Sequence, residues 1–86
     1  LGDDLYMRRA SLLERLGRYA EADTAYGSVL ANFGDEVWAD DACLRRGGLW
    51  ETHLGDAQRA RDLYEKLMLK YPDSAFVPEA ENGYEK

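Results

Sequence analysis

The chain has 86 residues, of which 45% are hydrophobic, and it carries a formal net charge of −6 at pH 7. That hydrophobic fraction argues against intrinsic disorder, and the excess of acidic residues argues against a surface that binds nucleic-acid phosphates. Cys43 is the single cysteine, so no internal disulfide forms. No apolar run approaches the roughly 18 residues of a membrane-spanning helix. We therefore expect one small domain without direct membrane insertion and without a nucleic-acid partner.

The first two helices are expected over Asp3–Leu16 and Tyr19–Phe33, because apolar residues recur in both every three or four positions. Gly17 separates them, since glycine ends a helix readily. The apolar stripe of the first helix comprises Leu5, Tyr6, Ala10, Leu13 and Leu16. That of the second comprises Tyr19, Ala22, Tyr26, Val29, Leu30 and Phe33.

A third helix is expected from about Glu36 to His53, with Asp35 as its N-cap. Gly47 and Gly48 lie inside this helix, where each glycine costs about 1 kcal/mol relative to alanine. Their presence predicts that a neighbouring helix approaches closely at this point.

The fourth helix is expected over about Asp56–Tyr71, and Pro72 stops it. A short fifth helix should follow from Ala75 to about Tyr84, weakened by Pro78 and frayed by Gly83. We expect it to cap the fourth helix. The fold class predicted from periodicity is therefore all-α.

The second and fourth helices repeat one pattern 38 residues apart. Leu16, Gly17, Ala22 and Tyr26 recur as Leu54, Gly55, Ala60 and Tyr64. The first and third helices are related by 37 residues, since Arg8, Arg9, Leu12 and Glu14 recur as Arg45, Arg46, Leu49 and Glu51. We expect the small residues to allow close helix approach and the two tyrosines to fill the wedge between hairpins. Trp38 and Trp50 are expected in the core rather than in a ligand-stacking site.

The run L-G-x-Y/A-x-x-A-x-x-x-Y-x-x-V/L-L/M-x-x-F/Y, followed in the second copy by Y-P-D-S, resembles the tetratricopeptide repeat (TPR). It is most similar to bacterial members with a stretched repeat, among them cell-envelope assembly lipoproteins. The resemblance implies two stacked antiparallel helical hairpins with a right-handed superhelical twist and a short capping helix. It places the first repeat at about 3–34, the second at about 36–72 and the capping helix at about 74–84. The 38-residue period exceeds the usual 34.

Residues typical of catalysis or of cofactor binding are scarce. Cys43 has no histidine nearby in sequence and is expected to be a buried packing thiol. His53 has no second histidine or cysteine at metal-ligand spacing and is expected to lie exposed at a helix end. Phosphate-binding and nucleophile motifs are also missing from the sequence. We expect no enzyme activity, no metal and no cofactor.

The expected function is a scaffold that binds a peptide or protein partner in the concave groove lined by the first helix of each repeat. The candidate groove residues are Asp4, Met7, Arg8, Ser11, Arg15, Asp41, Leu44, Arg45, Gly48 and Thr52. Arg8 and Arg45 have two interpretations. The favoured one pairs them with Asp4 and Asp41, four residues earlier on the same helix. The other directs them into the groove to hold a peptide carboxylate.

An alternative function is a C-terminal structural cap of a longer solenoid, or self-association through uncovered repeat ends. The chain begins with Leu1 rather than methionine, which favours a fragment of a longer protein. The identity of the partner stays open. So does the compartment, which is either the cytoplasm or the cell envelope.

Overall fold

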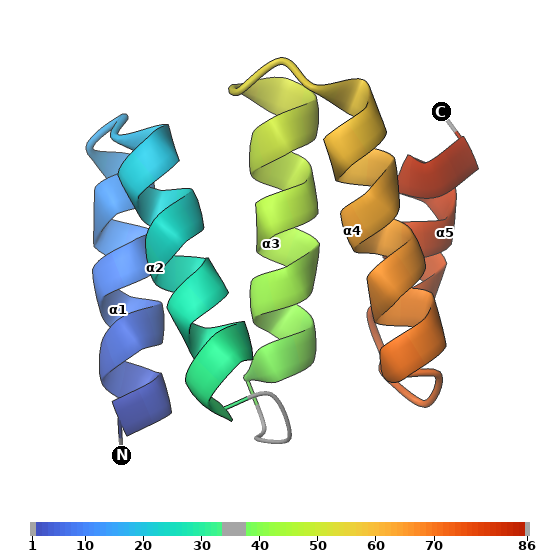
Figure 1. Cartoon of the computed structure of the whole chain (residues 1–86), viewed down its shortest axis with the longest axis horizontal. Helices are drawn as coiled ribbons and strands as arrows, with labels where there is room; N and C mark the ends of the chain where they lie inside the picture. The colour runs from blue at the N-terminus through green and yellow to red at the C-terminus, as the bar shows by residue number, and fades with distance from the viewer. Residues whose placement is uncertain (1, 34–37, 86) are drawn as a thin grey trace.

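The structure is a computed structural model that describes residues 2–33 and 38–85, with side chains from residue 5 to 32 and from 38 to 85. Each α-helix packs against the next in the chain, and Figure 1 shows the five side by side in sequence order. The helices are α1 (Gly2–Arg15), α2 (Tyr19–Phe33), α3 (Ala39–Thr52), α4 (Ala57–Lys70) and α5 (Val77–Glu85). The described residues contain no strand, so the predicted all-α class is confirmed.

Two equivalent glycines end the first helix of each hairpin. Gly17 and Gly55 have φ angles of +79° and +73°, in the left-handed region that glycine adopts at low cost. After α1, the Gly17 N–H donates to the Glu14 carbonyl at 3.0 Å, so the helix end satisfies a carbonyl that would otherwise lack a partner. The 38-residue repeat seen in the sequence is thus a repeat of backbone conformation as well.

The predicted start of α3 is wrong. The helix begins at Ala39, and its N-cap is Trp38 without a side-chain hydrogen bond. The first helical bond runs from the Ala42 N–H to the Trp38 carbonyl at 2.9 Å, which sets the start. Asp35, the expected N-cap, lies outside the described residues. Trp38 is also 38% exposed, so the expectation that it belongs to the core is wrong as well.

Helix α5 is better formed than its sequence indicates. Pro78 lies in the first turn, where its missing N–H removes no helical hydrogen bond. In the turn before α5, the Ser74 hydroxyl accepts a hydrogen bond from the Phe76 N–H at 3.0 Å and donates to Asp40 of α3. Gly83 does not fray the helix, which continues to Glu85.

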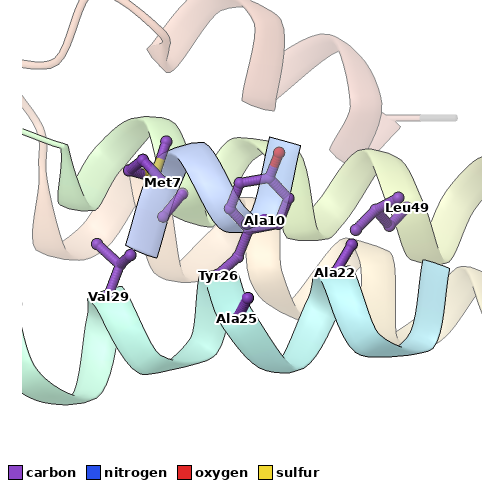
Figure 2. Packing of buried hydrophobic residues seen from close by; sticks show 8 residues of the cluster. Met7, Ala10, Ala22, Ala25, Tyr26, Val29 and Leu49 are labelled. Atoms are coloured by element: carbon purple, nitrogen blue, oxygen red, sulfur yellow. The ribbon is translucent and has the colours of Figure 1, made fainter. Parts of the chain in front are cut away.

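The core consists of two clusters, one for each hairpin. Figure 2 shows Tyr26, Val29 and Ala22 of α2 pointing toward Met7, Ala10 and Leu49. Cys43, Leu67 and Ala80 belong to the second cluster, which joins α3, α4 and α5. Tyr26 is fully buried and Tyr64 nearly so, in keeping with the predicted wedge positions. By contrast, Leu5 and Leu16 of the predicted first stripe are 66% and 62% exposed, because no described element covers that side of α1.

Candidate functional site

A groove of about 340 Å³ lies between α3 and α5, with α4 at its base. Three of the predicted groove residues, Leu44, Arg45 and Gly48, line it from α3. The other lining residues are Glu51 of α3, Tyr64 of α4, and Glu79, Asn82 and Gly83 of α5. The wall facing α3 is therefore α5, whereas the sequence analysis placed the binding face on α1 and α3.

Tyr64 occupies the base of the groove between two glycines. A Cβ atom on Gly47 would lie 2.5 Å from Cε1 of the ring, and one on Gly83 would lie 2.5 Å from Cε2. The ring thus fills the space that both glycines leave. The close approach predicted for Gly47 is present, but a Cβ on Gly48 would meet nothing within 4 Å, so the same prediction for Gly48 is wrong.

The Tyr64 hydroxyl is fixed by the same wall of the groove. It donates a hydrogen bond to Glu51 Oε1 at 2.9 Å. Burial, together with this hydrogen bond, raises the pKa of Tyr64 above its usual value, so the phenol stays protonated further into the alkaline range than a free tyrosine does. The ring is therefore held between the two glycines and by its hydroxyl at the base of the groove.

Arg45 brings a positive charge to a groove that also contains two glutamates. Its Nε donates to Asp41 Oδ1 at 3.0 Å, and its side chain remains 44% exposed. The pair with Asp41 predicted from the i,i+4 spacing is therefore present, and the same guanidinium also lines the groove. Glu51 and Glu79 make the local charge negative on balance.

The corresponding space between α1 and α3 is filled by core side chains. Met7, one of the candidate groove residues, is only 7% exposed and belongs to the first core cluster. The Tyr26 hydroxyl donates to Glu14 Oε1 at 2.8 Å. Burial and this hydrogen bond raise the pKa of Tyr26 to about 12. The prediction that Met7 contacts a partner is therefore wrong, because its side chain faces the core.

The other predicted residues of this face are spread along α1 and α3. Arg8 and Arg15 are exposed, Ser11 is half-buried and Thr52 is exposed at the end of α3. The side chain of Asp4 lies outside the described residues, as does its predicted pairing with Arg8. None of these residues lines the groove between α3 and α5.

Sequence reasoning missed a polar cluster between α2 and α3. Asp23 is 7% exposed and accepts hydrogen bonds from Arg46 Nε at 2.7 Å, from an Arg46 terminal nitrogen at 3.2 Å and from Trp50 Nε1 at 3.0 Å. The signal for it was an acid within α2, a helix that carries only one other charged residue, Glu21. An acid in so apolar a helix needs a partner when it is buried.

Cys43 and His53 lie where the sequence analysis placed them. Cys43 is fully buried, and its thiol donates to the Leu63 carbonyl at 3.2 Å. Burial raises the pKa of this thiol, so less of the reactive thiolate forms at a given pH. His53 is exposed as the C-cap of α3, with its ring stacked on Tyr19 at a centroid distance of 3.8 Å.

The described residues contain neither a cluster of metal ligands nor a membrane-spanning helix. Within residues 2–33 and 38–85, no three His, Cys, Asp or Glu side chains gather as metal ligands would. Among the described helices, none has both the length and the apolar character needed to cross a membrane.

Comparison with known families agrees with the helical hairpins. A model of the tetratricopeptide repeat matches residues 4–35 and 41–74, which together make up more than half of the chain. Comparison with curated proteins gave no significant match. Tetratricopeptide repeats are generally scaffolds for protein interaction and are typically non-catalytic. By its repeated hairpins and by this match, the chain belongs to the tetratricopeptide repeat family.

Proposed function

We propose that this chain is a non-catalytic interaction module that binds a peptide segment of a partner protein in the groove between α3 and α5. The observation that carries the proposal is the position of Leu44, Arg45 and Gly48. The sequence indicated these residues as a binding face, and they line a groove of about 340 Å³. A groove of this size accommodates a few side chains of an extended peptide.

The lining residues indicate the chemistry of the peptide. Leu44 and the edge of the Tyr64 ring offer apolar contact, and Arg45 offers a donor to a carboxylate. Glu79 on the opposite wall favours an amine or guanidinium. One interpretation of the sequence directed Arg45 toward a peptide carboxylate, which agrees with an acidic group in the peptide. The acidic wall of α5 adds a preference for a basic group beside them.

The extension of this surface along α1, through Arg8, Ser11 and Arg15, stays a prediction. They are accessible to a longer peptide, since two of them are exposed and Ser11 is half-buried. The division into repeats at about 3–34 and 36–72 likewise stays a prediction.

Selection of peptides from a displayed random library, followed by calorimetric titration, tests the proposal. Gly48→Gln should block the groove without straining the helix, because a Cβ at position 48 meets nothing within 4 Å. Arg45→Ala should weaken a selected acidic peptide by about 1.5 to 3 kcal/mol, the value of a hydrogen bond to a charged group.

Arg59→Ala is the matched control, because Arg59 lies over the Trp50 ring and does not line the groove. We expect this variant to bind like the parent. Peptides that bind the Gly48→Gln and Arg45→Ala variants as tightly as the parent would show that the groove is not the binding site.

A further inference from the structure

One side of α1 is apolar and uncovered by any described element. Leu5, Leu12 and Leu16 are 66%, 49% and 62% exposed, and Tyr6 beside them is 36% exposed. Together with Arg9 and Leu13, they form what we call the outer face of α1. Contiguous exposed apolar side chains of this kind mark interaction surfaces more often than scattered ones do.

The chain itself contains a covered copy of this face. Leu5 and Leu12 correspond to Ala42 and Leu49 of α3, 37 residues later. Ala42 and Leu49 are at most 1% exposed, and they belong to the core cluster that contains the apolar side chains of α2. Helix α2 thus covers on α3 the side that stays open on α1 (Figure 1).

The contact between α2 and α3 includes a specific charge pair. Asp23 of α2 accepts two hydrogen bonds from Arg46 of α3. Four residues further along α2, Gly27 leaves room for the guanidinium, since a Cβ at this position would lie 3.4 Å from the Arg46 Cζ atom. A covering helix that reproduces this contact has an acid followed four residues later by a small residue.

Arg9 is the counterpart of Arg46 on the outer face of α1. Its side chain is exposed, and it makes no hydrogen bond or ion pair with the described residues. It lines an open groove of about 320 Å³ between α1 and α2, with Tyr6 and Leu13 of α1 and Glu21, Thr24, Ala25 and Ser28 of α2. The acid among these, Glu21, is paired with Arg18. By the 37-residue correspondence, Arg9 holds on α1 the position from which Arg46 donates to Asp23.

We propose that the outer face of α1 docks an amphipathic α-helix of a partner protein, which presents aliphatic residues and an Asp or Glu to Arg9, with glycine or alanine four residues after the acid. This surface is distinct from the groove between α3 and α5, because the two share no lining residue. The proposal therefore does not rest on peptide binding there.

In a second copy of the chain, α2 carries this pattern but already packs on its own α3, and α4 does not carry it. In α4, the counterpart of α2, the position of Asp23 is occupied by Arg61 and that of Gly27 by Glu65. Arg61 is already engaged over the Tyr84 ring of α5. Two outer faces placed against each other would bring Arg9 toward its own copy, so the acid has to come from a different helix.

A synthetic peptide with the sequence of α2, residues 19–33, supplies the required pattern as a probe. A lactam bridge between Glu21 and a lysine introduced by Ala25→Lys holds it helical. Titrated into the whole labelled chain, it should produce saturable NMR shifts in α1, at Leu5, Arg9 and Leu12. The peptide carrying Asp23→Asn should bind at least about fivefold more weakly, because it cannot form the charged hydrogen bond.

Arg9→Gln in the protein should abolish the difference between the two peptides, whereas Arg59→Gln, at a residue that lines neither groove, should preserve it. The proposal is overturned by absent saturable binding, by shifts confined to α3 or to the groove beside α5, or by equal discrimination in the Arg9→Gln variant. It is also overturned if sedimentation shows a dimer of the chain that Leu12→Lys dissociates, since a second copy would then cover the face.

Discussion

Two junctions connect one hairpin to the next helix, α2 with α3 and α4 with α5, and they are held by different chemistry. At the first, Asp23 accepts hydrogen bonds from Arg46 and Trp50. At the second, the positions 38 residues later hold Arg61 and Tyr84, and the guanidinium lies 4.6 Å from the ring centroid. The same arrangement of helices therefore tolerates an acid–base pair at one junction and a base–aromatic pair at the other.

Burial separates the two junctions energetically. Asp23 is 7% exposed and the Arg46 side chain 22%, so both groups have lost most of their water. Arg61 is exposed and Tyr84 half-buried. Removing one partner of a buried charge pair leaves the other unsatisfied, whereas an exposed cation–π contact is worth about 0.5 to 1 kcal/mol. The first junction should therefore be the more sensitive to substitution.

Asp23→Ala should have the largest effect. It leaves the Arg46 guanidinium and the Trp50 N–H without their acceptor, and we expect a loss of about 2 to 4 kcal/mol in the free energy of unfolding, measured by urea denaturation. Arg61→Ala, the equivalent change at the second junction, should cost less than about 1 kcal/mol. Equal losses in the two variants would contradict the difference between the junctions.

Gly83→Ala should strain the second junction from the side of α5. A Cβ at this position would lie 2.5 Å from the Tyr64 ring, which Gly47 holds from the other side. Overpacking of this kind costs about 1 to 3 kcal/mol, partly offset by the better helix propensity of alanine, so thermal denaturation should show a lower midpoint.

Gly48→Ala is the matched control, because a Cβ there meets nothing within 4 Å. It should raise stability by about 0.5 to 1 kcal/mol through helix propensity alone. If Gly83→Ala stabilises the protein to the same extent, the ring is not confined as the structure indicates.

Alkaline pH should weaken both hairpins through their buried tyrosines. The pKa of Tyr26 is about 12 in the folded chain against 10.0 for the free side chain, so folding favours the protonated phenol. The stabilisation that this phenol contributes is fully present below pH 10. As the pH rises toward 12, the free energy of unfolding falls by about 1 to 2 kcal/mol. Tyr64 acts in the same direction, because its pKa is also raised.

Urea denaturation at pH values from 8 to about 12 measures this loss. Tyr26→Phe should reduce the fall in unfolding free energy per pH unit, and the double variant with Tyr64→Phe should reduce it further. An undiminished slope in the double variant would assign the alkaline loss to other groups.

Local signals made the helices predictable. Tyr19–Phe33 was predicted with both ends correct, because its apolar spacing is regular and Gly17 precedes it. The repeated Tyr26 and Tyr64 identified the wedge positions, since a large residue that recurs with small neighbours packs between helices. The start of α3 was not predictable in this way, because Asp35 is a favourable N-cap by composition and the helix nevertheless begins at Ala39.

Features set by tertiary contact could not be read from one helix at a time. Met7 and Leu5 look alike in the sequence, yet Met7 faces the core and Leu5 is exposed, which depends on where neighbouring helices lie. Gly48 was expected at a close helix approach and Gly83 at a frayed end, yet of these two glycines it is Gly83 that faces Tyr64. The opposite wall of the candidate groove was missed because it is formed by α5, a helix that was expected only to cap the fourth helix.

A double-mutant cycle on Asp23 and Arg46 tests most directly the claim that the junction between α2 and α3 is held by a buried charge pair. Urea denaturation of the parent, Asp23→Ala, Arg46→Ala and the double variant gives the coupling energy, and the same cycle on Arg61 and Tyr84 gives the comparison. We predict a coupling of at least about 1.5 kcal/mol for the first pair and no more than about 1 kcal/mol for the second. A first coupling that is equal to or smaller than the second would contradict the account.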